Sequence, residues 1–239
     1  MFQRDYIMRL IEQISSSIGA ILGMKKQLKP QEAMELVGET YKRLFGINPG
    51  LVRALSERDL VDLLSRDGES ASEKMFLIAG LLKEEAELCG MLEKPDDEYR
   101  LNLKALNLSL IAHKDHPNVE GWDTQGQIEE LVERLSHYEL PRGTKELLWP
   151  YYGSAGRYAD AEDVLFELLD DSREEAENAA PGFDRTAYIR LLDEACHFYE
   201  RLLETDEQAL EAGRLPIGEV RDGLAEVQAR AETLADRKI

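Results

Sequence analysis

The chain has 239 residues, of which 29 are Lys or Arg and 48 are Asp or Glu, so its formal charge at pH 7 is −19. This charge repels phosphate backbones and argues against a nucleic-acid-binding protein. A hydrophobic content of 43%, with only 8 Pro and 17 Gly, is typical of a globular protein and argues against a disordered or fibrous one.

The apolar residues recur at steps of three and four along almost the whole chain, and no segment shows the sustained two-residue alternation of a β-strand. In the first half this pattern predicts helices over residues 3–27 and 30–45, a short helix that Ser56 begins, a long helix from Ser72, and a helix that carries Tyr99 and ends near residues 113–118. Ser56 and Asp59 have the spacing of a capping box. Residues 65–72 read as an exposed loop.

In the second half we expect helices over residues 124–138, 142–154, 159–171, 184–204 and 217–237, joined by short turns with Gly or Pro. Short connections make successive helices antiparallel. The sequence therefore predicts an all-α fold of stacked antiparallel helical hairpins. We expect a single domain over 1–239, with an N-terminal hairpin (1–46), an irregular helical-repeat body (51–205) and a C-terminal helix (216–237).

Cysteine content and hydropathy bear on the cellular compartment. Cys89 and Cys196 lie in apolar-rich helical patterns with no spacing typical of a disulfide framework or a zinc site, so we expect free, buried thiols. The longest uncharged run near the N-terminus, residues 13–24, is short and Ser-rich, and no secretion signal precedes it. These features predict a cytoplasmic protein.

The stretch "YYGSAGRYADAEDVLFELL" carries a resemblance to a known repeat. Tyr152, Gly156, Tyr158 and Ala161 stand at the spacings that tetratricopeptide repeats use where their two helices meet, and the segment resembles one such repeat. The resemblance implies a solenoid of helical hairpins that binds other proteins through its helix faces.

Several residues depart from that repeat. Trp149 stands where the family has a small residue, Pro150 follows it and should bend the helix, and Arg173 stands in place of the closing Pro. A looser match at Ala33 lies 128 residues before Ala161, which is not a multiple of the family's period of about 34. We therefore expect an irregular, tetratricopeptide-like solenoid.

The start "MFQRDYIMRLIEQI", together with the stretch quoted above, is also similar to an uncharacterised bacterial protein family of helical-repeat type. This resemblance implies a helical fold and a cytoplasmic setting. It brings no activity and no site residues.

Two groups of residues have the chemistry of metal ligands. Glu194 and His197 form an E-x-x-H pair, the spacing used by di-iron and di-manganese helical bundles, although such a site needs a second pair and two more Glu residues. His113, Asp115 and His116 lie where a helix is expected to end, and they require a fourth ligand from a neighbouring loop to hold zinc. The alternative for these residues is a surface or interhelix position, where His also interacts favourably with a helix C-terminus.

We find no Walker loop, no G-x-G-x-x-G, no G-x-S-x-G and no H-E-x-x-H motif, so the sequence predicts neither an enzyme nor a cofactor. The densest aromatic group includes Trp149 and Tyr151. It reads as core filling or as a groove for a partner, with Tyr151 about 100° around the helix from Tyr152 and facing outward. Trp149 and Tyr151 are therefore the candidate partner-binding residues.

The N-terminal helix has a broad apolar face, and residues 1–50 carry seven basic and five acidic side chains. This face can pack on residues 30–45, pair with a second copy, or lie on a membrane, for which a charge of +2 is weakly favourable. The sequence as a whole predicts a non-catalytic protein–protein interaction module or scaffold that binds a protein partner or itself. A metal protein using Glu194 and His197, and a peripheral membrane protein, are the alternatives.

Overall fold

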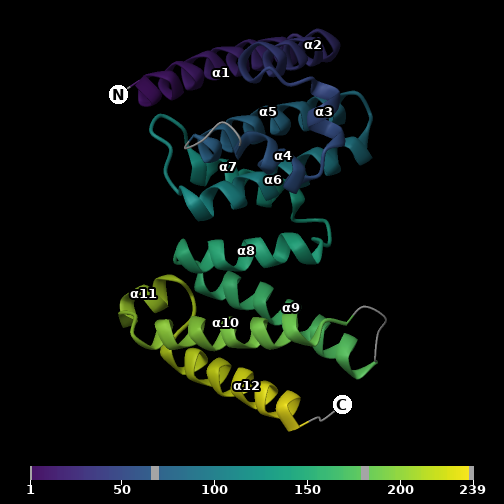
Figure 1. The fold of residues 1–239 in the computed structure, drawn as a ribbon. Helices are drawn as coiled ribbons and strands as arrows, with labels where there is room; N and C mark the ends of the chain where they lie inside the picture. The colour runs from purple at the N-terminus through teal and green to yellow at the C-terminus, as the bar shows by residue number, and fades with distance from the viewer. Residues whose placement is uncertain (1, 66–69, 179–182, 237–239) are drawn as a thin grey trace. The chain divides into compact units, whose positions relative to one another are not determined.

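A computed structural model describes residues 2–65, 70–178 and 183–236 of the protein (Figure 1). Within these ranges the chain is helical and forms no β-strand, which confirms the prediction of an all-α protein. The chain divides into two compact units, the N-terminal unit (Met1–Leu140) and the C-terminal unit (Pro141–Ile239). The predicted subdivisions lay near residues 46 and 205 instead, and a single domain over the whole chain stays a prediction.

The N-terminal unit is built from helices and one π-helical turn. These elements are α1 (Phe2–Lys26), α2 (Pro30–Thr40), the π-helical turn η1 (Tyr41–Phe45), α3 (Pro49–Ala54), α4 (Glu57–Ser65), α5 (Ala71–Met91), α6 (Pro95–Asp115) and α7 (Thr124–Leu135). Their bounds follow the predicted helices closely. Half of the loop predicted over residues 65–72 (66–69) lies outside the described residues; of the other half, Ser65 ends α4, and Ala71 and Ser72 are already in α5, so the loop is shorter than predicted.

Local capping explains where several of these helices begin. The Ser56 hydroxyl accepts a hydrogen bond of 3.1 Å from the Asp59 amide, so this residue starts α4 as predicted. Helix α3 was not predicted. It forms because the Asn48 side chain accepts a hydrogen bond of 2.9 Å from the Gly50 amide and Pro49 occupies the first helical position.

Helix α5 is the centre of the N-terminal unit. Most of its side chains between Lys74 and Cys89 are buried, with Lys83 and Glu87 partly exposed, and α1, α2, α4, α6 and α7 all pack against it. A helix that is apolar around its circumference is expected in the interior rather than at the surface. Because α5 also carries Glu84 and Glu85, two carboxylates are drawn into this interior and require partners.

Most of the apolar face of α1 is covered within this unit, while Ile18 is half-buried and Leu22 is exposed. Ile7, Leu10, Ile14 and Ile21 are all at most 8% exposed, and α1 packs against α2 and α5. The structure thus agrees with the first of the three readings of this helix, in which it packs on residues 30–45. None of the helices in the described ranges combines the length and apolarity needed to cross a membrane.

The C-terminal unit contains α8 (Arg142–Ser154), α9 (Tyr158–Glu177), α10 (Arg185–Leu203), α11 (Glu207–Ala212) and α12 (Ile217–Asp236). Helix α9 continues six residues beyond its predicted end at Asp171, because Arg173 keeps the backbone donor that a closing Pro would lack. Helix α11 was not predicted; the Asp206 side chain begins it by accepting a hydrogen bond of 3.1 Å from the Gln208 amide.

The residues that resemble a tetratricopeptide repeat form the turn between α8 and α9, which pack against each other. Gly156 has φ of +75°, a left-handed conformation that other residues adopt only with strain. Ala161 and Leu165 are fully buried on the first turns of α9. Helix α8 continues through Pro150 to Ser154, and the predicted bend stays a prediction.

Helices α10 and α12 run antiparallel and approach closely. The Arg185 side chain near the start of α10 donates a hydrogen bond of 2.6 Å to the Leu234 carbonyl near the end of α12. Further along, a Cβ atom added to Gly223 would lie 2.5 Å from Cζ of Tyr199. Glycine is therefore required where α12 crosses this buried tyrosine.

Candidate functional site

A groove in the N-terminal unit lies between α1, α5 and the segment that leads into α7. We call it the α1–α5–α7 groove. It has a volume of about 440 Å³, and the residues that matter most are Ile18 and Leu22 on α1, Gly80 and Lys83 on α5, and Trp122 and Gln127 at α7. Leu22 is 41% exposed and Trp122 is half-buried, so this groove presents apolar surface on two of its walls.

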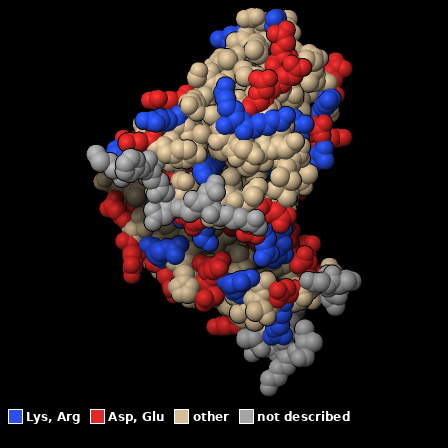
Figure 2. Space-filling model, turned by 45° about the horizontal axis from the view of Figure 1, so that its top comes forward, with Lys and Arg blue, Asp and Glu red and all other residues tan. Residues whose placement is uncertain are grey.

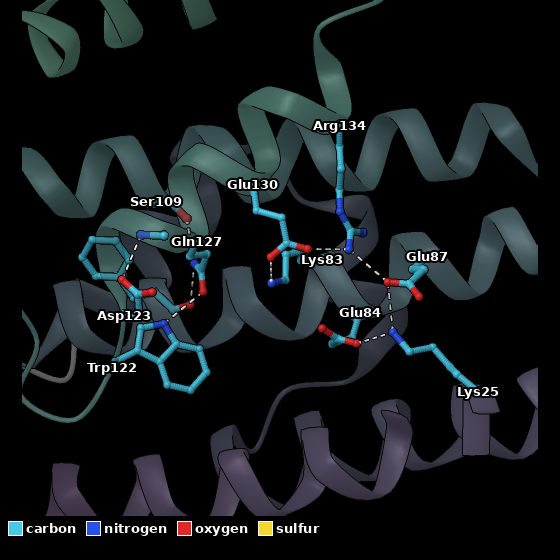
Figure 3. Close-up of polar contacts among 12 residues, drawn as sticks. Lys25, Lys83, Glu84, Glu87, Ser109, Trp122, Asp123, Gln127, Glu130 and Arg134 are labelled. Atoms are coloured by element: carbon cyan, nitrogen blue, oxygen red, sulfur yellow. Dashed lines mark hydrogen bonds and ion pairs between the residues drawn. The ribbon is translucent and has the colours of Figure 1, made fainter. Parts of the chain in front are cut away.

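Trp122 is held in place by buried polar groups (Figure 3). Its Nε1 donates a hydrogen bond of 2.9 Å to Oε1 of Gln127. Gln127 is 5% exposed, and its Nε2 donates to the Phe76 carbonyl at 3.2 Å and to the Ser109 hydroxyl at 2.9 Å. Because Gln127 is anchored to both α5 and α6, the indole ring has a fixed orientation at the groove.

The backbone around Trp122 supports the same geometry. Gly121 has φ of +82°, in the left-handed region, and an isolated antiparallel bridge pairs Val119 with Trp122. Asp123 then begins α7, accepting a hydrogen bond of 2.9 Å from the Gly126 amide. Below the ring, a Cβ atom on Gly80 would lie 2.6 Å from Cζ2 of Trp122, so the indole packs directly on the α5 backbone.

A continuous chain of ion pairs links α1, α5 and α7 beside the groove (Figure 3). The links run in the order Glu84, Lys25, Glu87, Arg134, Glu130, Lys83. Lys25 Nζ lies 2.5 Å from Oε2 of Glu84 and 3.0 Å from Oε2 of Glu87, and the side chains of Lys25 and Glu84 are each 6% exposed. Three carboxylates thus face three cations, which leaves the set neutral.

The titration of two of these carboxylates follows from their partners. Partial burial raises the pKa of Glu87, but hydrogen bonds and charge from Lys25 and Arg134 outweigh it and leave the pKa below its ordinary value. Burial likewise raises the pKa of Glu130, and Lys83 with Arg134 lowers it by more. Both groups are therefore ionised at neutral pH and are engaged with neighbouring cations.

A second buried polar group lies where α3 meets α5 and α6. The Glu85 carboxylate is fully buried and accepts a hydrogen bond from Arg53; burial raises the pKa of Glu85, while the positive charge of Arg53 opposes this effect. Lys104 Nζ donates to the carbonyls of Val52 at 3.0 Å and Arg53 at 2.9 Å. Lys104 thus caps the C-terminus of α3. The charged groups at this position therefore stabilise the fold.

Neither residue predicted to bind a partner lies at the surface. Trp149 is 5% exposed and packs edge-on against Phe198, with ring centroids 5.8 Å apart. Tyr151 is 4% exposed, so the prediction that it faces outward is wrong. The ring centroids of Tyr151 and Tyr152 are 5.8 Å apart. Both of these adjacent positions on α8 are buried, although the helical angle between them suggested that one would face solvent.

The predicted metal ligands do not converge. Glu194 and His197 are both exposed on α10, and His197 Nδ1 lies 2.8 Å from the Asp193 carbonyl of its own helix. His113 is half-buried near the end of α6, where burial lowers its pKa, and His116 is exposed just beyond that helix. In the part of the chain that the structure describes, no three His, Cys, Asp or Glu residues are grouped so that they hold a metal ion.

The two cysteines differ in their environments. Both are free, as predicted, and Cys89 is buried. Cys196 is partly exposed, so the prediction that it is buried is wrong. Cys196 lies on α10 at the margin of its contact with α12, where its side chain is partly open to solvent.

Fold and groove together define an all-α protein with a surface cleft walled by helices. The chain matches, over residues 1–232, the model of the family of unknown function DUF6483, and it belongs to that family. No curated protein and no solved structure matches it. The prediction of an uncharacterised family is thereby confirmed, and the family's description names no repeat type.

Proposed function

We propose that this protein is a non-catalytic protein-binding module, and that the α1–α5–α7 groove holds a segment of its partner. The observation that carries the proposal is the half-buried Trp122, whose ring is fixed by Gln127 and faces an open groove. Tryptophan is enriched among the residues that contribute most to binding at protein interfaces. Ile18 and Leu22 on the opposite wall supply further apolar surface.

The polar groups beside the groove support a binding role rather than a catalytic one. Lys83 is paired with Glu130, and Glu84 with Lys25. A general acid, general base or nucleophile must be able to reach a substrate with its reactive atoms. In this groove the charged atoms face each other, so their contribution is to hold α1, α5 and α7 together.

The charge of the protein bears on the kind of partner. Figure 2 shows acidic and basic side chains intermixed on one face of the molecule, so no single-sign field covers this face. The net charge of −19 nevertheless favours a basic or neutral partner over an acidic one and disfavours nucleic acid. A second copy of the chain is the alternative partner, and it carries the same unfavourable charge.

We further infer that the helices form stacked antiparallel hairpins in an irregular, tetratricopeptide-like solenoid, and that the protein is cytoplasmic. Support for the hairpins comes from the three-residue links between α5 and α6 and between α8 and α9, whose helices pack against each other. The tetratricopeptide likeness rests on the turn at Gly156. The cytoplasmic setting rests on the free thiols of Cys89 and Cys196.

Affinity enrichment from cells that make the protein tests the binding role. We expect the wild type to enrich a protein that Leu22→Asp fails to enrich, because a buried carboxylate at this wall opposes docking. Leu51→Asp is the matched control, since Leu51 is similarly exposed (44%) but lies on α3 outside the groove. Identical protein sets for all three baits would contradict the proposal.

A further inference from the structure

We propose that a second groove, between α10 and α12, binds an amphipathic helix of a partner protein that carries an apolar stripe flanked by basic side chains. This groove belongs to the C-terminal unit and shares no residue with the α1–α5–α7 groove. The inference therefore goes beyond the proposed function, and its test does not depend on whether the α1–α5–α7 groove binds a partner.

The groove is apolar and open. It has a volume of about 240 Å³; its apolar lining is Ile189, Leu192 and Cys196 on α10 with Ala231 and Leu234 on α12, and its charged lining is Arg185 and Asp193. Ile189 is 50% exposed, which is unusual for a residue type that is most often fully buried. Leu203, two turns beyond Cys196, is 38% exposed on the same helix.

Exposed or half-buried apolar residues recur in a column on each of the two helices. Ile189, Cys196 and Leu203 are spaced by seven on α10, and Ile217, Leu224 and Ala231, all half-buried, are spaced by seven on α12. Ile189, Cys196 and Ala231 line the groove itself. From the antiparallel register given by the contacts of Arg185 with Leu234 and of Gly223 with Tyr199, we infer three rungs: Ile189 with Ala231, Cys196 with Leu224, and Leu203 with Ile217.

Two helices with matched columns every seventh residue leave a row of holes into which the side chains of a third helix fit. The columns extend from Ile189 to Leu203, which at 1.5 Å per residue is about 21 Å. A partner helix of about 15 residues matches that length. An extended peptide would place its side chains with a period of two, which does not match rungs one heptad apart.

Acidic side chains follow the solvent side of the α10 column, while the basic side chain that lines the groove, Arg185, lies at its end and donates a hydrogen bond to the Leu234 carbonyl. Asp193, Glu200 and Glu204 are exposed beside the apolar column. Two of these carboxylates lie close enough to Cys196 to affect its titration. Burial raises the pKa of the Cys196 thiol, and the charges of Glu200 and Asp193 raise it further. The C-terminal unit as a whole has 12 basic and 23 acidic side chains, so basic flanks on the partner complement it and a second copy is repelled.

Protection of the Cys196 thiol tests this inference in the full-length protein. The probes are two synthetic 21-residue helices with Leu at the a and d heptad positions, one with Lys and the other with Glu at the flanking positions. The readout is the rate of Cys196 alkylation by N-ethylmaleimide, with the modified site identified by mass spectrometry. With the Lys-flanked helix at about ten times its Kd, we expect the rate to fall about tenfold, and little change with the Glu-flanked helix.

Variants separate groove binding from general attraction to an acidic protein. Ile189→Asp should abolish the protection, whereas Leu22→Asp, in the other groove, should leave it intact. The double variant Asp193→Lys/Glu200→Lys changes only exposed side chains and should reverse the preference toward the Glu-flanked helix.

Equal protection by both helices, protection by neither, or protection that survives Ile189→Asp would overturn the inference. A dimer would overturn it as well. In that case Cys196 alkylation would slow as the concentration of the protein without peptide rises, and Ile189→Asp would dissociate the dimer. That result would assign the groove to a second copy of the chain.

Discussion

The N-terminal and C-terminal units bury charge in different ways. In the N-terminal unit a central helix, α5, is buried along most of its length, and the paired side chains of Glu84 and Lys25 are buried with it. In the C-terminal unit α9, α10 and α12 each bury one face and keep most of their charged residues at the surface, although Lys145 on α8 is buried and pairs with the exposed Glu167. We therefore expect the loss of an ion pair between two buried side chains to cost most in the first unit, and a change in helix separation to cost most in the second.

The sharpest way to test this contrast is to remove one partner of a buried ion pair. Lys25→Ala leaves the Glu84 carboxylate buried without its cation, and we expect a loss of about 3–5 kcal/mol in the free energy of unfolding. Urea denaturation measures it. The control is Arg4→Ala, because Arg4 and Glu120 form an exposed pair (72% and 64%) whose loss should cost about 0–1 kcal/mol. Equal effects for the two variants would contradict the contrast.

The C-terminal unit should respond most to changes in helix separation. Gly223→Ala places a methyl group 2.5 Å from the Tyr199 ring, and we expect a loss of about 1–3 kcal/mol because α10 and α12 must move apart. Gly218 is also in α12 but has no atom within 4 Å of an added Cβ, so Gly218→Ala should be neutral or stabilise by up to about 1 kcal/mol. Thermal unfolding that is the same for both variants would show that this close approach does not contribute.

A smaller effect is expected at the floor of the α1–α5–α7 groove. Gly80→Ala directs its methyl group to within 2.6 Å of Trp122, an indole that shifts more easily than a helix backbone, and we expect a loss of about 1–2 kcal/mol. In a Trp149→Phe background, Trp122 emission should move to longer wavelength and become easier to quench with acrylamide. Unchanged emission would mean that the indole does not pack on α5.

The smallest effect concerns acid. The pKa values of Glu87 and Glu130 are lowered by their cations, so the folded state binds fewer protons than the unfolded state as the pH falls. The stabilisation from these pairs is complete above the ordinary Glu pKa of about 4.3 and is lost as the pH falls below it toward the lowered values. The double variant Glu87→Gln/Glu130→Gln should show a shallower decline of stability between pH 5 and 3 (roughly the range set by these pKa values).

Much of the fold follows from patterns in the sequence. Apolar residues such as Ile7, Ile14 and Ile21 repeat with a helical period, and the ends of α1 and α8 lie within one residue of their predicted positions. Helices α3 and α11 were missed because six residues are too short to show a period. Their only signals are the capping residues Asn48 and Asp206.

The candidate sites were harder to predict, since they depend on which helices meet. Trp122 stands just before the helix predicted from Thr124, with polar residues on both sides, and only the folded chain places the indole over Gly80 and against Gln127. Tyr151 was predicted to face outward from its angle on α8, but burial there covers more than one face of the helix. The spacing of Ile189, Cys196 and Leu203 was a signal present in the sequence, although its meaning required the register of α12.

The central claim, that the α1–α5–α7 groove is a partner-binding site, is tested most directly by photo-crosslinking in living cells. A photoreactive phenylalanine derivative is incorporated in place of Leu22, at the groove, and separately in place of Leu51, which is similarly exposed outside it. We predict a discrete crosslinked species at position 22 that is absent at position 51. No crosslink at position 22, or the same products at both positions, would contradict the claim.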